Sequence, residues 1–268
     1  GSFRDCYTLN AAARSDEQLE MIRFLGRLLG VAIRTKDYLD LCLAPEFWAN
    51  IVNDRPNSLR DLATSDVFTV REIIREVLRL TRGGHGSSLE NLELNFVAAT
   101  SDGRDVPLKR GGESIRVNLD NAQDFVHRLL RLRLDTESRP QRLALREGLS
   151  EIVPVSLLTL YTRRQAERLV CGDADIDIDL LRENTVYGDT TSDQEDLKGD
   201  EVEVKIFWKV LSSFDCKRRA DFLRFVYGRT RLPLRSDFTR PFNIRHKTSV
   251  KVKPNQDIPT AQTCFFRL

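Results

Sequence analysis

One long stretch near the start of the chain, residues 15–34, constrains the fold more than any other. Its apolar residues recur at three- and four-residue steps, which predicts an amphipathic helix. Ser15 and Gln18 stand at the spacing of a capping box, so the helix is expected to begin there. Gly26 and Gly30 leave one side of the helix without side chains, and another backbone is therefore expected to pack closely against it.

The remaining pattern is mostly helical with a short β insert. Helices are predicted at 45–51 after Pro45, at 70–77, from Asn121, at 143–153 beyond Pro140, at 162–171, at 202–213 and at 216–227. Residues 92–96 and 114–119 alternate like half-buried strands, with a turn at 101–103 between them, and 242–245 is a further strand candidate. The predicted fold class is α+β: a large, mainly helical lobe with a β-hairpin sub-lobe, followed by a small α/β lobe.

The boundary between the two predicted lobes falls after Gly172, where a helix ends and an acidic stretch begins. We expect Gly172, Asp173, Ala174 and Asp175 to form a hinge. The predicted organisation is then an N-terminal lobe over 1–172, a hinge over 173–176 and a C-terminal lobe over 177–268. The hairpin sub-lobe is expected at about 66–135.

Composition excludes several classes of function. Lys and Arg number 42 against 40 Asp and Glu, and this balance argues against a nucleic-acid binder, which would carry a basic excess. No uncharged run approaches the length of a membrane span. The five cysteines and three histidines are scattered, so neither a disulfide framework, a metal site nor a cofactor is expected. An intracellular compartment fits best, and the opening Gly1-Ser2 without methionine indicates a fragment.

The last stretch of the chain, 258–268, places Cys264 between Thr263 and the pair Phe265-Phe266. A thiol beside aromatic residues is most often a packing group, so this stretch alone is weak evidence for chemistry. Cys42, within an apolar run, is expected to be a core thiol. Cys171 and Cys216 lie on predicted helices and are expected to be packing groups as well.

The order of motifs along the whole chain resembles the HECT ubiquitin-ligase domain, and within it the large HERC-type members most. The resemblance rests on Phe24-Leu-Gly-Arg-Leu-Leu-Gly-Val-Ala-Ile33, Glu167-Arg-Leu-Val-Cys-Gly172, Phe207-Trp208, Phe225-Val-Tyr-Gly-Arg-Thr-Arg-Leu-Pro233 and Ile258-Pro-Thr-Ala-Gln-Thr-Cys264. It implies that a conjugating enzyme passes ubiquitin to Cys264 as a thioester, and that ubiquitin then moves to a lysine of a protein substrate. Ubiquitin, the conjugating enzyme and protein substrates are the implied partners. The cytoplasm is the implied location, with the nucleus as the alternative.

The resemblance also implies roles for individual residues. Thr263 would support the ubiquitin thioester, with simple strand pairing as the alternative. The conjugating enzyme would bind the sub-lobe, with Phe125 as the central apolar contact and Leu94, Asn95, Val70 and Ile74 as further contacts. For each of these residues ordinary core packing is the alternative. If Phe125 is a contact, Phe125→Ala should weaken ubiquitin loading and leave the fold intact.

Two departures from the family pattern bear on activity. Gln262 stands where many members have a histidine, and the segment that usually follows the cysteine is absent after Leu268. An acidic group is suspected as the base for the lysine, and Asp257 is one candidate. A catalytically impaired module that binds conjugating enzyme or ubiquitin is therefore an alternative function. A cysteine hydrolase is a third, but no histidine has a spacing that argues for it.

Overall fold

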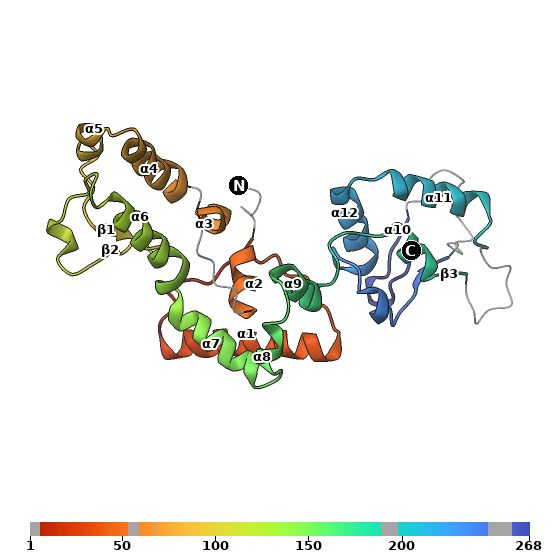
Figure 1. Ribbon diagram of the computed structural model, residues 1–268. Helices are drawn as coiled ribbons and strands as arrows, with labels where there is room; N and C mark the ends of the chain where they lie inside the picture. The colour runs from red at the N-terminus through yellow and green to blue at the C-terminus, as the bar shows by residue number, and fades with distance from the viewer. Residues whose placement is uncertain (1–5, 53–58, 67, 189–197, 246–258) are drawn as a thin grey trace. The chain divides into compact units, whose positions relative to one another are not determined.

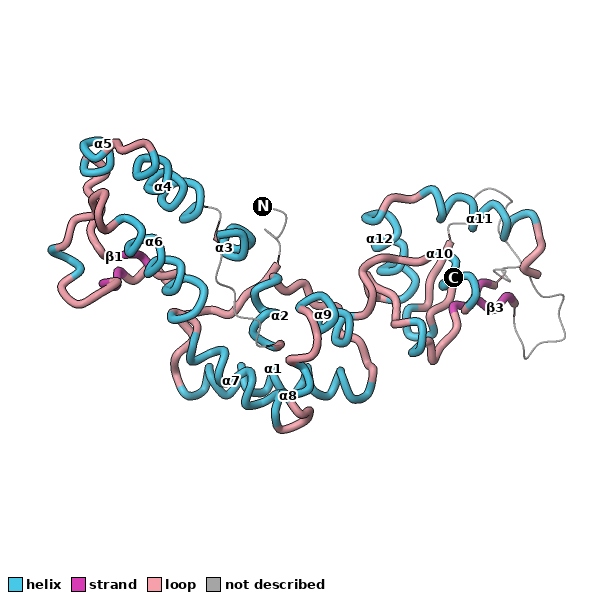
Figure 2. The backbone as a smooth tube through the Cα atoms, viewed as in Figure 1, coloured by secondary structure: helices cyan, strands magenta, loops and turns pink. Residues whose placement is uncertain are grey.

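The structure is a computed structural model that describes residues 6–52, 59–66, 68–188, 198–245 and 259–268 (Figure 1). The chain divides into two compact units. The first comprises Gly1–Asp37 and Leu41–Glu167, and the second comprises Tyr38–Asp40 and Arg168–Leu268. Helices predominate in the described residues, and the strands are short (Figure 2).

The elements follow one another in two groups. Those of the first unit are α1 (Asp16–Thr35), α2 (Pro45–Ile51), α3 (Leu59–Ser65), α4 (Arg75–Arg82), α5 (Gly86–Glu90), β1 (Val97–Ala99), β2 (Asp105–Pro107), α6 (Ala122–Arg131), α7 (Arg139–Ser150) and α8 (Val155–Leu158). The division passes through α9 (Arg163–Cys171). Those that follow are α10 (Ile178–Glu183), β3 (Thr185–Tyr187), α11 (Val202–Ser213), α12 (Cys216–Tyr227) and β4 (Phe242–Ile244).

Helices α1 and α7 form the closest helix pair of the first unit (Figure 1). The capping box at Ser15 and Gln18 is present as predicted. A Cβ added at Gly26 would collide with the carbonyl oxygen of Leu145, and one at Gly148 would collide with that of Arg23. The prediction that a second backbone lies against the glycine face of α1 is therefore confirmed.

The predicted sub-lobe has its own hydrophobic core. A π-helical stretch, Thr69–Ile74, runs directly into α4, and both pack on the helix α6. The hairpin β1–β2 closes around the predicted turn, but both of its paired strands lie closer to that turn than predicted. The predicted segments do meet: the Phe96 N–H donates to the Ile115 carbonyl at 3.0 Å and the Val117 N–H to the Leu94 carbonyl at 2.8 Å. They form one isolated bridge, between Asn95 and Arg116, and a 3₁₀ turn at Gly112–Ser114 leads into the second segment.

The second unit combines helices α10, α11 and α12 with a parallel strand pair and an aromatic core. Helices α11 and α12 have the predicted bounds; Asp215 caps α12 and Gly228, in the left-handed region, ends it. β4 pairs in parallel with β3, and Val186 stands opposite Asn243. β3 was not predicted, because three residues directly after a helix show no alternation that a sequence pattern could reveal.

A short segment from early in the chain, Tyr38–Asp40, belongs to this second unit. The buried Tyr38 hydroxyl donates to Asp237 at 2.6 Å, and the Thr230 hydroxyl donates to Asp40 at 2.6 Å. Burial raises the pKa of Tyr38, and the hydrogen bond to the Asp237 carboxylate raises it further. The chain therefore enters this unit twice.

The first two residues of the expected hinge, Gly172 and Asp173, contact Leu232 of the second unit. Asp173 and Leu232 exchange two backbone hydrogen bonds, of 2.8 and 3.2 Å. Gly172 has φ +82°, and a Cβ there would collide with the Leu232 carbonyl. Gly172 and Asp173 are therefore tied to the second unit by these contacts with Leu232.

Candidate active site

Cys264 lies at the tip of a tight turn near the end of the chain. Thr263–Phe265 form one turn of 3₁₀ helix, and the residues on either side close it: the Gln262 N–H donates to the Arg267 carbonyl at 2.9 Å. The segment after the turn runs beside β4, where the Asn243 N–H donates to the Phe266 carbonyl at 2.9 Å and the Leu268 N–H to the Asn243 carbonyl at 2.9 Å. The strand pairing therefore fixes where the turn projects.

Phe266 anchors this turn in the core. Its ring is 1% exposed, and its centroid lies 4.3 Å from that of Tyr227 and 4.9 Å from that of Phe242. Its backbone is in the left-handed region, at φ 47°, which reverses the chain directly after Phe265. This backbone conformation is unfavourable for a phenylalanine, and the burial of its ring offsets the cost.

The residues before Phe266 face solvent. Thr263, Cys264 and Phe265 are all exposed, and no hydrogen bond to the Cys264 thiol is seen among the described residues. The Arg240 guanidinium donates to the Cys264 carbonyl at the long distance of 3.5 Å. Gln262, at the position of the histidine in many family members, accepts from Arg267 at 3.1 Å. The thiol is thus accessible to solvent and has no hydrogen-bond partner among the described residues. Attack on an acyl group carried by another protein requires such an accessible thiol.

The other cysteines differ from the predictions in two places. Cys171 is buried as expected. Cys42 is exposed instead of packed in the core, because its segment lies at the surface beside Tyr7, and its Sγ is 2.9 Å from that of Cys6. Cys216 is exposed as well, at the first position of α12. Exposure alone therefore does not distinguish Cys264.

The residues expected to contact a conjugating enzyme are mostly buried. Phe125, Val70 and Ile74 are at most 3% exposed and belong to the core of the sub-lobe. The Phe125 ring meets that of Phe96 edge to face at 5.6 Å. Leu94 and Asn95 are half-buried, and the Asn95 amide donates to the Glu113 carbonyl at 2.9 Å. For Phe125 the burial supports the alternative of core packing.

Sequence reasoning missed the apolar residues of this region that do reach the surface. Phe68 is 69% exposed, and Leu92 and Leu119 are more than a third exposed. Apolar spacing gave no signal for them, because the same pattern marks core positions.

Among the described residues of the second unit, Cys264 has neither the histidine that a cysteine hydrolase needs nor a set of metal ligands. The described part of the second unit contains no histidine, since His85 and His127 belong to the first unit and His246 lies outside the described residues. Asp257, the suggested base, also lies outside them. Among the residues that the structure does describe, no three His, Cys, Asp or Glu side chains cluster as ligands of a metal ion would. Likewise, none of the described helices is long and apolar enough to cross a membrane.

Comparison with known families identifies the family to which the chain belongs. The model of the HECT-domain (ubiquitin-transferase) family matches residues 2–268, and the chain belongs to this family. The family assignment covers both units and includes the turn that carries Cys264.

Individual relatives are named E3 ubiquitin-protein ligases. The chain is 36% identical over 275 residues to the E3 ubiquitin-protein ligase HERC2 of Mus musculus and of Homo sapiens, and the match covers 100% of this chain. It is 28% identical over 278 residues to the E3 ubiquitin-protein ligase RSP5 of Chaetomium thermophilum, again over 100% of this chain. The chain spans 5% of the length of the HERC2 proteins and 32% of that of RSP5.

Proposed function

We propose that this chain is the catalytic part of a HECT-type ubiquitin-protein ligase, with Cys264 as the residue that carries ubiquitin. The carrying observation is the terminal turn, where an exposed thiol projects from a segment fixed by the buried Phe266. Family membership supplies the substrate class, and the relatives named above are E3 ubiquitin-protein ligases.

The proposed chemistry is two successive acyl transfers. The Cys264 thiolate attacks the thioester carbonyl that joins ubiquitin to the conjugating enzyme, and the bond to that enzyme's sulfur breaks. The conjugating enzyme leaves as a thiol, and ubiquitin is now joined to Cys264. A lysine amine of the substrate then attacks the new carbonyl, loses a proton and forms an amide, and Cys264 is released. No metal or redox cofactor enters either step.

Thr263 is proposed to support the thioester. Its side chain is exposed beside Cys264, and its Cβ would lie 3.6 Å from a Cβ added at Gly228. Gly228 ends α12 in the left-handed region, so the helix end leaves room next to the turn. Because Thr263 adjoins Cys264 in the chain, its hydroxyl is proposed to donate to the acyl oxygen of the thioester.

Transfer between two partners requires that the thiol move relative to the docking site. We propose that the two units are the moving parts, corresponding to the N- and C-terminal lobes of the family. The hinge is proposed near Gly172–Asp175, with the pivot at the N-terminal end of this stretch, because two hydrogen bonds tie Asp173 to Leu232 of the second unit. Conjugating-enzyme docking is proposed on the sub-lobe at about 66–135, where Leu94 and Asn95 are partly accessible and Phe68 is exposed.

A loading assay tests the proposal. The chain is incubated with activating enzyme, a panel of conjugating enzymes and ubiquitin, and the products are separated on a non-reducing gel. We expect a ubiquitin adduct that thiols reverse and that Cys264→Ala abolishes. Cys216→Ala is the matched control, because Cys216 is also exposed and lies in the same unit, and it should load normally.

The same assay decides between the proposal and its alternatives. An adduct that survives Cys264→Ala would assign the thioester to another residue and defeat the proposal. A chain that binds conjugating enzyme but forms no adduct, even when extended beyond Leu268 by the segment typical of the family, would be the catalytically impaired module instead.

A further inference from the structure

A cavity of about 310 Å³ in the first unit is lined largely by arginine side chains. It lies where the end of α2 meets the helical stretch that leads from α6 into α7. The polar residues that line it are Asn50, Arg131, Asp135, Arg139, Arg142 and Arg146. Four guanidinium groups therefore share one cavity with a single carboxylate among the described lining residues.

Helical spacing explains why these arginines converge. Arg139, Arg142 and Arg146 are three and four residues apart on α7, so their side chains share one face of that helix. Arg131, the last residue of α6, and Asp135 stand one turn apart on the stretch before α7. The positive charge of the cavity is thus held in place by arginines on helices α6 and α7.

Two of the arginines are fixed in the wall. Arg146 donates to the carbonyls of Asn50 and Ile51 at 2.8 and 3.0 Å and so ends α2. Arg142, with a side chain 13% exposed, pairs with Asp135 and donates to the Asn50 side chain at 3.4 Å. The Nε of Arg142 is buried with no acceptor in the described part of the chain, and an unmet donor of this kind is costly.

The other two arginines are available. Arg131 and Arg139 are exposed, and neither makes an ion pair or a side-chain hydrogen bond with any residue that the structure describes. The one carboxylate in the lining, Asp135, is already occupied by Arg142. Like charges held together repel, and a bound anion relieves that repulsion.

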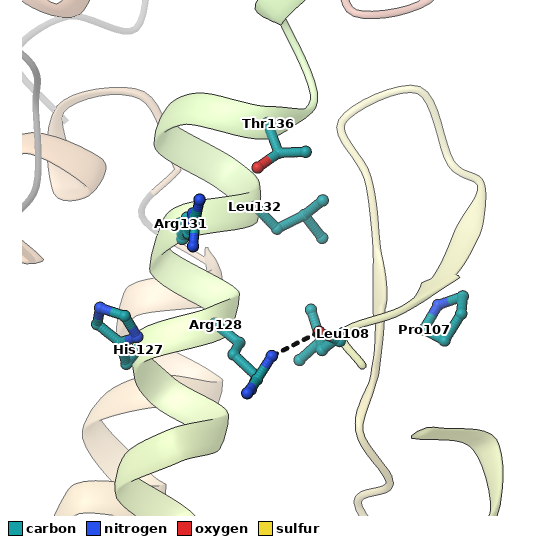
Figure 3. Close-up of a pocket in the computed structure, with 7 residues that line it drawn as sticks. All are labelled: Pro107, Leu108, His127, Arg128, Arg131, Leu132 and Thr136. Carbon is teal, nitrogen blue, oxygen red and sulfur yellow. Dashed lines mark hydrogen bonds between the residues drawn. The ribbon is translucent and has the colours of Figure 1, made fainter. Parts of the chain in front are cut away.

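A neighbouring cavity contains an arginine, Arg128, whose hydrogen bonds are made within the protein (Figure 3). It measures about 290 Å³ and shares Arg131 with the first. There Arg128 donates to Asp124 at 2.7 Å and to the Leu108 carbonyl at 3.4 Å. Arg128 serves the sub-lobe's own structure, whereas Arg131 borders both cavities without a partner among the described residues.

We propose that the cavity around Arg131, Arg139, Arg142 and Arg146 binds a phosphoryl group. Planar guanidinium groups match phosphate oxygens in bidentate pairs, and the fixed and available arginines together offer more donors than one carboxylate accepts. The volume is in the range of small-molecule sites, which begins at about 300 Å³. The phosphoryl group belongs either to a small organic polyphosphate or to a phosphorylated side chain of a partner. This site is separate from Cys264 and does not depend on the proposed ligase chemistry.

Binding measurements on the 268-residue chain test the site, by calorimetry or fluorescence anisotropy at about 0.15 M salt, where the Debye length is about 8 Å. The probes are inositol hexakisphosphate, inorganic phosphate, and a phosphoserine peptide with its unphosphorylated counterpart. The test variant is Arg131→Ala with Arg139→Ala, which removes the two available groups. The matched control is Arg82→Ala with Arg110→Ala, two exposed arginines of the same unit that line neither cavity.

We expect saturable binding of a phosphorylated probe, weakened at least about tenfold by the test variant and little changed by the control. Arg139→Lys keeps the charge and loses the bidentate geometry, so an intermediate loss is expected. Binding of the hexakisphosphate alone would assign a small-molecule source, and phosphate-dependent binding of the peptide would assign a protein source.

The proposal is overturned by any of three results: no saturable binding of any phosphorylated probe, equal losses in test and control variants, or, where a peptide is the only probe that binds, equal affinity for its phosphorylated and unphosphorylated forms. Circular dichroism melts of each variant confirm that the comparison is made between folded proteins. The Arg131 and Arg139 side chains make no ion pair or hydrogen bond with the described residues, so nearly unchanged melting is expected.

Discussion

The sub-lobe and the terminal turn use phenylalanine in different ways. In the sub-lobe, Phe125 was expected to meet a partner, yet it is 2% exposed and packs on Phe96. In the terminal turn, the equally buried Phe266 supports three exposed neighbours, among them Cys264. The difference teaches that an aromatic residue inside a functional motif often positions the chemistry and leaves the contact to the residues beside it.

The largest expected effect tests the sub-lobe. Phe125→Ala should lower the free energy of unfolding by about 3–5 kcal/mol, because it removes a buried ring and leaves a cavity. Chemical denaturation measures this. Phe68→Ala is the control: its ring is 69% exposed, so a change within about 0.5 kcal/mol is expected. Unchanged stability with weak ubiquitin loading in Phe125→Ala would restore its role as a contact.

The next effect tests the turn. Phe266→Ala should destabilise the second unit by about 3 kcal/mol and also reduce ubiquitin loading, because the ring fixes the turn that carries Cys264. Phe265→Ala, at the neighbouring exposed position, should leave stability nearly unchanged. Equal destabilisation by both variants would show that the buried Phe266 does not anchor the turn more than the exposed Phe265 does.

A smaller effect is expected at Thr263. Thr263→Val keeps the shape of the side chain and removes the hydroxyl, so stability should hold. If the hydroxyl supports the thioester, single-turnover loading should slow about fivefold, the value of one net hydrogen bond of about 1 kcal/mol. Wild-type loading in this variant would leave Thr263 with a purely structural role.

The smallest effect concerns the hairpin at the far end of the sub-lobe. Hydrogen bonds from Thr100 and Arg104 lower the pKa of Asp102 to about 2. Since the folded pKa lies below the unfolded one of about 3.9, the charged form stabilises the turn above that value, and this contribution is lost as pH falls through about 2. An NMR titration of the Asp102 carboxyl measures the midpoint. Arg104→Ala should raise it, and an unmoved midpoint would show that the ion pair plays no part.

The long helices could be predicted from the sequence because their patterns are local. Ser15 with Gln18 marks the start of α1, and Asp215 with Gly228 bounds α12. The short strands could not be placed as well, since β3 depends on its distant partner β4. For the same reason Phe125 and Phe265 look alike in sequence, and only the packing of distant segments decides that one is buried and the other exposed.

The contact between α1 and α7 also has a consequence for how the chain is made. Gly26 on α1 is complementary to a backbone that the ribosome produces only when α7 has been synthesised. At about 5–20 residues per second, the apolar face of α1 waits for roughly ten seconds without its native cover. The first unit therefore cannot complete its folding before α7 has been synthesised, and until then the face of α1 that packs on α7 is exposed on the nascent chain.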